Sequence, residues 1–587
     1  MKNKKQSIII GGLLGSAGIF VSKIIGILYV IPFTALIGES NLVYYSSAFR
    51  IYEYLLNISL AGFPFAIATL VAKYAAKGDY KTTLFIRKLS TSIMATIGFV
   101  SMIVLILCSG WLSGVMMPSN ASKESLEITK IVLILIAFAL FFVPLLSSIR
   151  GFYQGLKNME IYAVSQVLEQ LSRVIFLLGV GAIAVYIFNQ DQIYAVYFAV
   201  ISTSFSAVLA YIHIRIYDKR KMKEYRLLIK EQTVKANENK EALFKEIIRI
   251  SVPYLLLALF GYSYVLIDTT LFSKSVEYFY NNSDTFINYS KILSSNFSSL
   301  STNMSSILAP SASVNYDVAL ASANYTNSLF GISFLKVAKL TAIPMILAPG
   351  FSLAIIPYIT TALAEKSYKK VRKNILDCIE SVLYIGLPLV FCLFFLAKPI
   401  YYFMYGGANV ELGSQILRWF CVDAFFSTIV PIFASLMMAL ELRKFNIINT
   451  ILAVVLKCIL IVPLVQHFSY MGIILSSVPT YILLMGVDLK VFSMKFKLKY
   501  KKTLLKIAIM MLGILAMYIS FVLLSYMGLC SINTSRIMCF INLGILGLVG
   551  CGVYFMITYI LQLPQMILGI NLSNIKAKFL KGKRNEA

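Results

Sequence analysis

Windows of 18 or more mostly apolar residues recur along the whole chain, and this recurrence constrains the fold more than any other feature. Each window is long enough to cross a hydrocarbon core of about 30 Å as an α-helix. Fourteen such windows lie at residues 8–30, 42–72, 84–108, 129–149, 160–187, 191–214, 247–272, 331–363, 375–402, 411–440, 445–466, 468–489, 503–527 and 537–563. The sequence therefore predicts an all-α polytopic membrane protein with about 14 transmembrane helices.

Bulk composition supports the same class. Of the 587 residues, 59% are hydrophobic and 13% are charged, and the mean hydropathy is +0.80. This leaves too little polar surface to cover soluble domains of that size. The first window contains Lys23 and has no small-x-small cleavage site, so we expect a retained helix rather than a signal peptide.

The formal net charge of +27 could suggest nucleic-acid binding, but the positions of the basic residues favour a topological explanation. With the N-terminus inside, 40 of the 53 Lys and Arg residues fall in cytoplasmic segments, six fall outside and seven lie within spans. This alternation follows the positive-inside rule and predicts that both termini are cytoplasmic. We expect anionic membrane lipids as partners, and no nucleic acid.

Two polar segments suggest how the chain is divided. A basic segment at 218–246 is predicted to be a cytoplasmic linker between an N-lobe of six helices (1–217) and a C-lobe of six helices (247–492). A segment at 273–330, rich in Asn, Ser and Tyr, is predicted to be an external loop of the C-lobe, and a surface insertion is favoured there over a binding domain. Residues 493–587 would add two helices and a basic cytoplasmic tail. Both lobes then enter from the cytoplasm, as parallel repeats do.

Ionisable residues within spans are the candidates for a binding site, because each costs roughly 2.5–3.5 kcal/mol on insertion scales. Lys23, Arg50 and Glu53 lie in the first two spans. Lys336 and Lys339 lie three residues apart in the eighth span, with no acidic residue within a turn. Lys336 is nearer the outer end, where it can snorkel, so Lys339 is the stronger candidate for a buried cation. We predict that these five residues bind an anionic substrate such as a carboxylate or a pyrophosphate.

Other intramembrane charges are predicted to be structural. Glu169 and Arg173 lie four residues apart in the fifth span and can neutralise each other, so exchanging the two should preserve much of the activity. Asp268 lies toward the outer end of the seventh span, where its role is open. Three further residues could pair across helices: Arg418, Asp423 and Lys457.

Catalytic and metal chemistry is not indicated. Eight scattered cysteines and two histidines predict no disulfide, zinc, haem or other cofactor. An enzyme of lipid-linked sugars would need acidic or histidine groups near an external face. The external loop offers only Glu277, Asp284 and Asp317, which are dispersed. We therefore expect a transporter without catalytic residues.

Small residues and prolines predict close packing and broken helices. Pro64 should interrupt the second span, and Pro344, Pro349 and Pro357 the eighth. A stripe of small residues at spacings of three and four should let another helix approach the first span; it consists of Gly11, Gly15, Gly18, Ser22 and Gly26.

Two neighbouring segments resemble a known signature. Residues 150–159 read RGFYQGLKNM and residues 165–174 read SQVLEQLSRV, which is similar to the signature of the stage V sporulation protein B type of polysaccharide transporters. Further matches are Ser22 to Gly26, Ala61 to Pro64, Gly386 to Pro388 and Ala397 to Ile400. The resemblance covers roughly residues 8–490, and the last two spans match by number and hydrophobicity.

The resemblance implies the multidrug/oligosaccharidyl-lipid/polysaccharide exporter fold, with two six-helix lobes around a central cavity. Its lipid II flippase branch adds two C-terminal helices. Members flip undecaprenyl-pyrophosphate-linked sugars by alternating access, with cations holding the headgroup and a groove at the extra helices holding the lipid tail. Lys23 falls where that branch carries a basic residue, whereas Tyr29 stands where some flippases have a second cation.

The expected function is translocation of lipid II, a cell-wall precursor, from the cytoplasmic to the outer leaflet. The expected partners are this lipid-linked anionic substrate and, as a candidate, the cell-wall synthesis machinery. Two alternatives stay open: a flippase for another lipid-linked oligosaccharide or polysaccharide repeat unit, and a cation-coupled drug exporter of the same fold.

Overall fold

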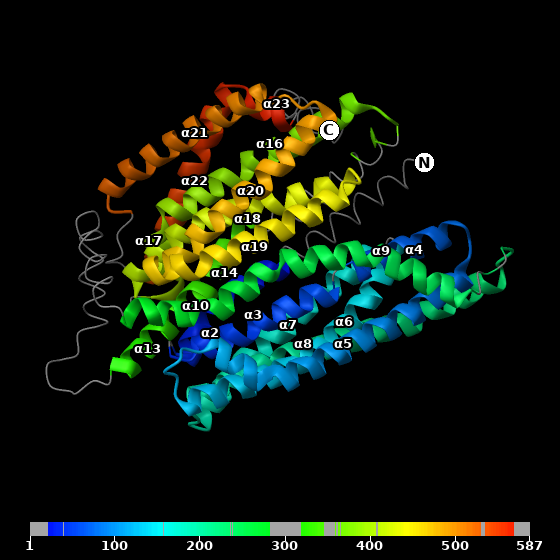
Figure 1. The fold of residues 1–587 in the computed structure, drawn as a ribbon, viewed down its shortest axis with the longest axis horizontal. Coiled ribbons are helices and arrows are strands. Elements are labelled where there is room, and N and C mark those ends of the chain that lie inside the picture. Colours follow the sequence, from blue (N-terminus) through cyan, green and yellow to red (C-terminus); the bar gives the residue numbers. More distant parts are fainter. Residues whose placement is uncertain are drawn as a thin grey trace, which may run out of the picture. The chain divides into compact units, whose positions relative to one another are not determined.

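The computed structural model describes residues 21–281, 318–345, 359, 362–363, 365–406, 409–529 and 535–568, apart from positions 39, 61, 157, 235, 237 and 238. These residues are almost entirely helical, and no strand occurs among them (Figure 1). The all-α prediction is confirmed.

Twelve helices in the described part of the chain are long and apolar enough to cross a membrane. Two shorter apolar helices, Val21–Ile37 and Ala66–Ala76, fall within the first and second predicted spans. The longest candidate, Lys240–Tyr280, contains two consecutive helices, α9 and α10. The polytopic class therefore holds, while the count of fourteen stays a prediction.

Contacts divide the chain into two compact units, and unit 1 comprises residues 1–339 and 450–477. Besides the helix Val21–Ile37, whose second half is α2 (Val30–Ile37), its elements are α3 (Leu42–Leu60), α4 (Phe63–Ala76), α5 (Tyr80–Met116), α6 (Lys123–Gly155), α7 (Met159–Ala182), η1 (Ile183–Ile187), α8 (Gln192–Lys230), α9 (Lys240–Gly261), α10 (Ser263–Asn281), α13 (Val318–Gly331) and η2 (Ile332–Val337). The two η elements are π-helices.

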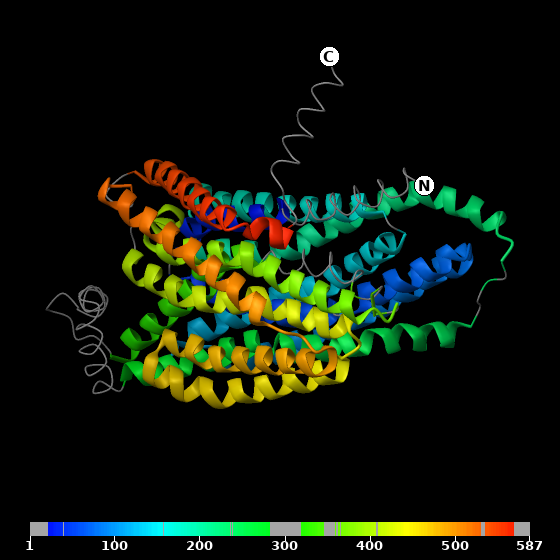
Figure 2. The same cartoon turned by 90° about the horizontal axis from the view of Figure 1, so that it is seen from above.

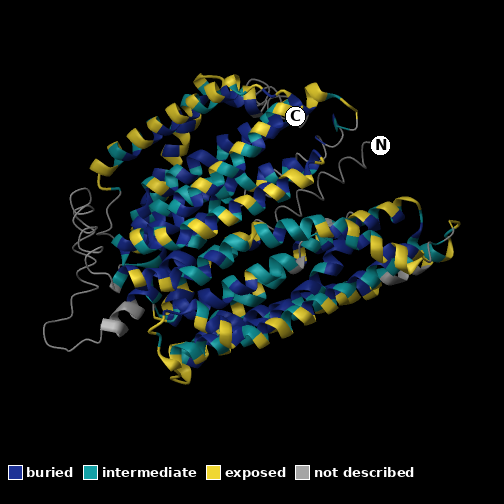
Figure 3. Cartoon of the chain, viewed as in Figure 1, coloured by how far each residue is buried: buried dark blue, intermediate teal, exposed yellow. Residues whose placement is uncertain are grey.

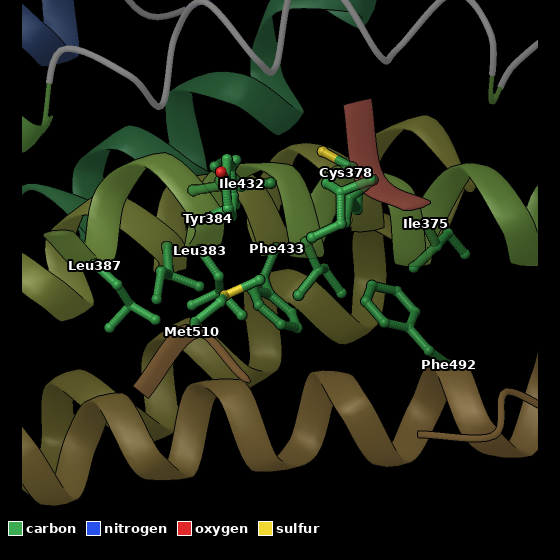
Figure 4. Packing of buried hydrophobic residues seen from close by; sticks show 14 of the residues in the cluster. Ile375, Cys378, Leu383, Tyr384, Leu387, Ile432, Phe433, Phe492 and Met510 are labelled. Atoms are coloured by element: carbon green, nitrogen blue, oxygen red, sulfur yellow. The ribbon is translucent and has the colours of Figure 1, made fainter. Parts of the chain in front are cut away.

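Unit 2 comprises residues 340–449 and 478–587. Its elements are α14 (Ala338–Met345), which begins at the unit boundary, α16 (Tyr368–Phe395), α17 (Ala397–Tyr405), α18 (Val410–Ala439), α21 (Lys501–Tyr526), α22 (Arg536–Ile560) and α23 (Leu563–Leu568). The helices α19 (Arg443–Phe468) and α20 (Tyr470–Phe496) belong partly to each unit. The core of unit 2 packs side chains of α16, α18, α20 and α21 against one another, such as Leu383, Phe433, Phe492 and Met510 (Figure 4).

Polar residues begin several of these helices. Asp79 accepts a hydrogen bond from the Thr82 backbone N–H (3.0 Å) at the start of α5, and Ser122 accepts one from Ser125 (3.1 Å) at the start of α6. Asp191, Asn239 and Ser535 cap α8, α9 and α22 in the same way. Such caps satisfy backbone donors that have no partner within the helix.

The second predicted span is broken, as Pro64 indicated. Helix α3 ends at Leu60 and α4 begins at Phe63, with Pro64 in its first turn. Between them Gly62 has φ +73°, and a Cβ atom there would lie 2.7 Å from the Tyr254 Cβ atom of α9. Both the left-handed backbone and the close approach require glycine at this position. In the eighth span, Pro344 lies inside α14, while Pro349 and Pro357 lie outside the described residues.

Several helices have exposed residues along one face (yellow in Figure 3), and many of these residues are large and apolar. On α5, Leu107 and Trp111 are 78% and 68% exposed, and on α22, Leu548 is 79% exposed. Helices α21 and α22 run side by side, and both expose apolar side chains along their length (Figure 2). Lipid is the medium in which such surfaces are stable.

The structure describes parts of the two predicted polar segments, the linker 218–246 and the loop 273–330. Helix α8 runs on to Lys230, so the first half of the predicted linker 218–246 is helical, and α9 begins at Lys240. In the predicted loop 273–330, α10 extends to Asn281 and α13 begins at Val318, whereas residues 282–317 lie outside the described residues.

Candidate functional site

Lys23 and Glu53 lie on neighbouring elements of unit 1. Lys23 belongs to the helix Val21–Ile37 and Glu53 to α3, and both side chains are exposed in the structure. The charged groups that act electrostatically on Lys23 are Glu53 and Lys339. The first, second and eighth predicted spans therefore bring these three charges together, although the spans are far apart in sequence.

Arg50 is held by two elements of the same unit. Its Nε atom donates a hydrogen bond to Thr269 Oγ1 of α10 at 2.8 Å. The centre of its guanidinium group lies 4.2 Å from the centroid of the Phe334 ring in η2. An aromatic face and a hydroxyl orient the planar guanidinium group, and neither of them neutralises its charge.

Lys336 and Lys339 differ in burial, and the order is opposite to the one expected. Lys336 is only 2% exposed, whereas Lys339 is partly exposed. The Lys339 ammonium lies 5.4 Å from the Phe49 ring centroid and 5.9 Å from that of Tyr29. Lys336 lies in the π-helix η2, whereas Lys339 lies in the first turn of α14.

Of the five predicted residues, the structure thus brings Lys23, Glu53 and Lys339 together, and Arg50 lies one turn before Glu53 on α3, while Lys336 is buried in η2. The aromatic rings beside Lys339 and Arg50 stabilise a cation without cancelling it. Three basic side chains, Lys23, Arg50 and Lys339, therefore lie on neighbouring apolar helices with Glu53 among them.

The predicted pair of Glu169 and Arg173 forms, and it has a third member. Glu169 lies 3.1 Å from Arg173 Nη2 and 2.9 Å from Arg150 Nη1, and all three side chains are between 10% and 14% exposed. Arg150 Nε also donates to Ser165 Oγ at 2.8 Å. A nearly buried carboxylate therefore bridges two guanidinium groups, which supports the structural role expected for the pair.

Other residues of the 150–159 segment fix the packing of unit 1. Tyr153 donates its hydroxyl hydrogen to Asp218 Oδ1 of α8 at 2.7 Å, and Asp218 also pairs with Arg87 of α5. A Cβ atom at Gly151 would lie 2.9 Å from the backbone oxygen of Pro64, so α4 and α6 touch here. The described residues of this segment therefore join helices of unit 1.

Lys457 pairs with Asp268 of α10, and its side chain is fully buried. Their atoms lie 2.9 Å apart. In unit 2, Asp423 accepts a hydrogen bond from the Tyr481 hydroxyl at 2.8 Å. Lys457 and Asp423 therefore both have partners on other helices. These partners, Asp268 and Tyr481, are not among the three residues that the sequence suggested could pair with one another.

Buried polar contacts attach α21 and α22 to α16. The carboxylate of Glu380 accepts hydrogen bonds from Thr503 (2.6 Å) and Lys506 (2.5 Å) of α21. The hydroxyls of Tyr384 and Thr558 lie 3.0 Å apart, and Tyr554 donates to the backbone oxygen of Tyr384 at 3.0 Å. The two C-terminal helices are thus specifically packed within unit 2.

The polysaccharide biosynthesis protein family model matches residues 11–363, which is more than half of the chain. The chain belongs to this family. The matched region includes all five candidate residues and the Arg150–Glu169–Arg173 network. A second model, for the lipid II flippase MurJ, matches residues 299–536.

Relatives of known sequence agree with this assignment. The chain is 27% identical over 582 residues to the lipid II flippase MurJ of Bacillus subtilis (strain 168), covering 98% of each protein. It is also 27% identical over 170 residues to stage V sporulation protein B of the same strain, covering 29% of this chain and 32% of that protein. With its apolar helices, the chain is a multi-pass protein of the bacterial cell membrane.

Solved structures show the same fold. A lipid II flippase MurJ in an inward closed conformation aligns with a TM-score of 0.62 at 13% identity, covering 94% of this chain and 98% of that one. An outward-facing multidrug resistance MATE family transporter of the MOP superfamily aligns with a TM-score of 0.53 at 14% identity, covering 84% and 96%. The expected exporter fold is therefore confirmed.

Two partnerships escaped sequence reasoning. Arg150 lies just beyond the predicted span 129–149 and so is not among the charges predicted within spans, although its place in the signature that also contains Glu169 is a usable signal. The pairing of Lys457 with Asp268 joins residues 189 positions apart. No helical spacing relates two residues so far apart. The sequence showed only that each is a charged residue within a predicted span, not that the two are partners.

Proposed function

We propose that this protein flips lipid II, the undecaprenyl-pyrophosphate-linked precursor of the cell wall, from the cytoplasmic to the outer leaflet. The observation that carries the proposal is that Lys23 and Lys339, on apolar helices far apart in sequence, lie close enough to interact electrostatically and remain at least partly exposed. The similarity to a lipid II flippase over 98% of each chain supports this choice of substrate.

The cations would act on the pyrophosphate. Lysine ammonium groups act as point charges, while the guanidinium group of Arg50 offers a planar fork for two oxygens. Phe334 and Thr269 orient that fork. Glu53 keeps Lys23 from being an uncompensated charge when no substrate is bound, and the anion then competes with this carboxylate.

Translocation would proceed by alternating access. A charged headgroup cannot cross the hydrocarbon core unaided, because desolvating a pyrophosphate is too costly. A hydrated cavity lined by the cations lowers that cost and can open to one side at a time. The translocation step is a conformational change, and it makes and breaks no covalent bond.

The lipid tail would follow α21 and α22. These helices expose apolar side chains along their length, for example Leu512, Leu515 and Leu548. Polar substitutions on this face should impair flipping and leave expression intact. A truncation near residue 500 that stayed fully active would contradict this role, whereas a loss of activity could also come from instability, because the truncation removes both α21 partners of the buried Glu380.

Charge distribution supports the orientation of the chain and its surface partners. We expect reporters fused at 230 and 580 to be cytoplasmic and those at 120 and 300 to be external. A cytoplasmic signal at 300 would overturn the plan of two six-helix lobes. The basic cytoplasmic segments would contact anionic lipids, and the cell-wall synthesis machinery is the candidate protein partner.

Depletion tests the substrate. Cells depleted of this protein should accumulate lipid II in the inner leaflet, and the wild-type gene should reverse the accumulation. Accumulation of a different lipid-linked oligosaccharide would favour the second candidate, which the match to the polysaccharide biosynthesis protein family over residues 11–363 supports. Unchanged precursor pools would contradict both.

A further inference from the structure

Lys457 has an unusual environment within unit 1. Its side chain is 0% exposed, and four oxygen atoms surround its ammonium group. They are Asp268 Oδ1 at 2.9 Å, the Ile473 backbone oxygen at 3.0 Å, Ser476 Oγ at 3.0 Å and Ser477 Oγ at 2.6 Å. We call these four atoms the oxygen cage.

The cage provides an acceptor for each N–H donor of the lysine and a carboxylate in addition. The three donors of the ammonium group bond to the oxygens of Ile473, Ser476 and Ser477 on α20, and Asp268 Oδ1 of α10 adds its negative charge at 2.9 Å without making a hydrogen bond. A simple ion pair would need only the carboxylate. Carboxylate, backbone carbonyl and hydroxyl oxygens together are the ligand set that hard cations prefer.

The surroundings of Lys457 place this residue within the apolar, candidate membrane-spanning part of α19. Its neighbours along the helix, Val455 and Ile459, are 51% and 64% exposed and apolar. A lysine turned toward the unit interior at this level is costly unless its charge is fully coordinated. The two serines and the Ile473 carbonyl provide that coordination beyond what Asp268 provides.

We infer that the oxygen cage is a monovalent cation site which the chain fills with its own ammonium group. An ammonium group and a potassium ion have closely similar radii, and both are satisfied by a shell of oxygens. In the native protein no ion from solution can enter, because Lys457 occupies the position. Removing the lysine side chain should therefore create a site for a free cation.

The test uses the purified full-length protein and its thermal unfolding midpoint, Tm. Lys457→Ala is compared with wild type in choline, sodium, potassium and methylammonium chloride at equal ionic strength. We expect the wild-type Tm to be the same in all four salts. The Tm of the variant should fall by several degrees in choline and should rise saturably with at least one of the small cations, as binding linkage requires.

Two control variants separate the cage from an ordinary ion pair. Adding Asp268→Asn to Lys457→Ala removes the only charged ligand, so the recovery by cations should disappear. Lys506→Ala removes a lysine that pairs with the buried Glu380. The carboxylate of Glu380 also accepts a hydrogen bond from Thr503. That variant should lose stability without saturable recovery.

Two results would overturn the inference. One is a folded Lys457→Ala variant whose Tm is equal in choline and in all three small cations. The other is recovery that persists in the double variant. If Lys457→Ala does not accumulate in cells, growth with methylammonium chloride should restore its abundance in the membrane, and failure to do so contradicts the cage.

These measurements involve no lipid substrate. A failure of the cage therefore leaves the proposed flippase function intact, and a protein that proves to carry a different lipid can still contain the cage.

Discussion

Two groups of charges in unit 1 illustrate opposite ways of holding charge inside a membrane. Arg150, Glu169 and Arg173 form a compact network in which one carboxylate bridges two guanidinium groups. Lys23 and Lys339 lie beside Glu53 and aromatic rings, and their side chains remain at least partly exposed. The first group is closed by protein contacts, whereas the second is open to a ligand.

The difference teaches how to distinguish a structural charge from a binding charge. Both groups carry an excess of positive charge, so net charge alone does not separate them. What separates them is burial and the nature of the partner. A nearly buried carboxylate fixes its arginines in one geometry, whereas an aromatic face leaves the charge available to an incoming anion.

The largest expected effect comes from removing two cations of the open group. Lys23→Ala combined with Lys339→Ala should abolish complementation of a depleted strain, and each single variant should do so on its own. The reason is that a pyrophosphate would lose the charges that offset its desolvation. Growth is measured together with membrane abundance, because abundance should stay normal. Normal growth of the double variant would remove the anion-binding mechanism.

In the closed group, Glu169→Gln should act on stability. It leaves two nearly buried guanidinium groups without their carboxylate, which typically costs about 3–5 kcal/mol. The purified variant should therefore unfold at a clearly lower temperature and accumulate less in the membrane. A Tm equal to that of wild type would show that the network is not structural.

Exchange of the pair refines this result. The variant Glu169→Arg with Arg173→Glu was expected from sequence to preserve much of the activity. Because Arg150 also binds Glu169, the exchange moves the carboxylate one turn away from Arg150. We now expect only partial recovery relative to either single variant, and full recovery would mean that Arg150 contributes little.

Arg50→Lys should have an intermediate effect on transport. The substitution keeps the charge but removes the planar fork and its stacking on Phe334, so we expect roughly a tenfold loss, or about 1.4 kcal/mol. Flipping is measured in vesicles against Arg50→Ala, which should lose more. Equal rates for Arg50→Lys and wild type would show that only the charge matters.

The smallest effects come from a matched pair of hydroxyls. Thr269 and Ser165 each accept a hydrogen bond of 2.8 Å from the Nε atom of an arginine, Arg50 in the open group and Arg150 in the closed one. Thr269→Val should slow flipping severalfold, whereas Ser165→Ala should cost about 1–3 kcal/mol of stability and leave the flipping rate per folded molecule unchanged. The reverse pattern would exchange the roles of the two groups.

Sequence reasoning predicted what depends on hydrophobicity and local spacing. The helical fold, the break near Pro64 and the pair of Glu169 and Arg173 follow from rules that act within one or two turns. The burial of Lys336 did not follow, because it depends on the packing of η2 against helices such as α3. The oxygen cage also escaped, since its ligands come from α10 and α20 and are brought together only by tertiary packing.

The break at Gly62 also has a mechanical consequence. Because α3 and α4 are not one continuous rod, a twist of α3 about its own axis need not turn α4, which packs on α5, α6 and α9. A few backbone torsions near a glycine are enough to absorb such a twist. The side chains of Arg50 and Glu53 on α3 can then change direction while α4, the other half of the same predicted span, keeps its packing.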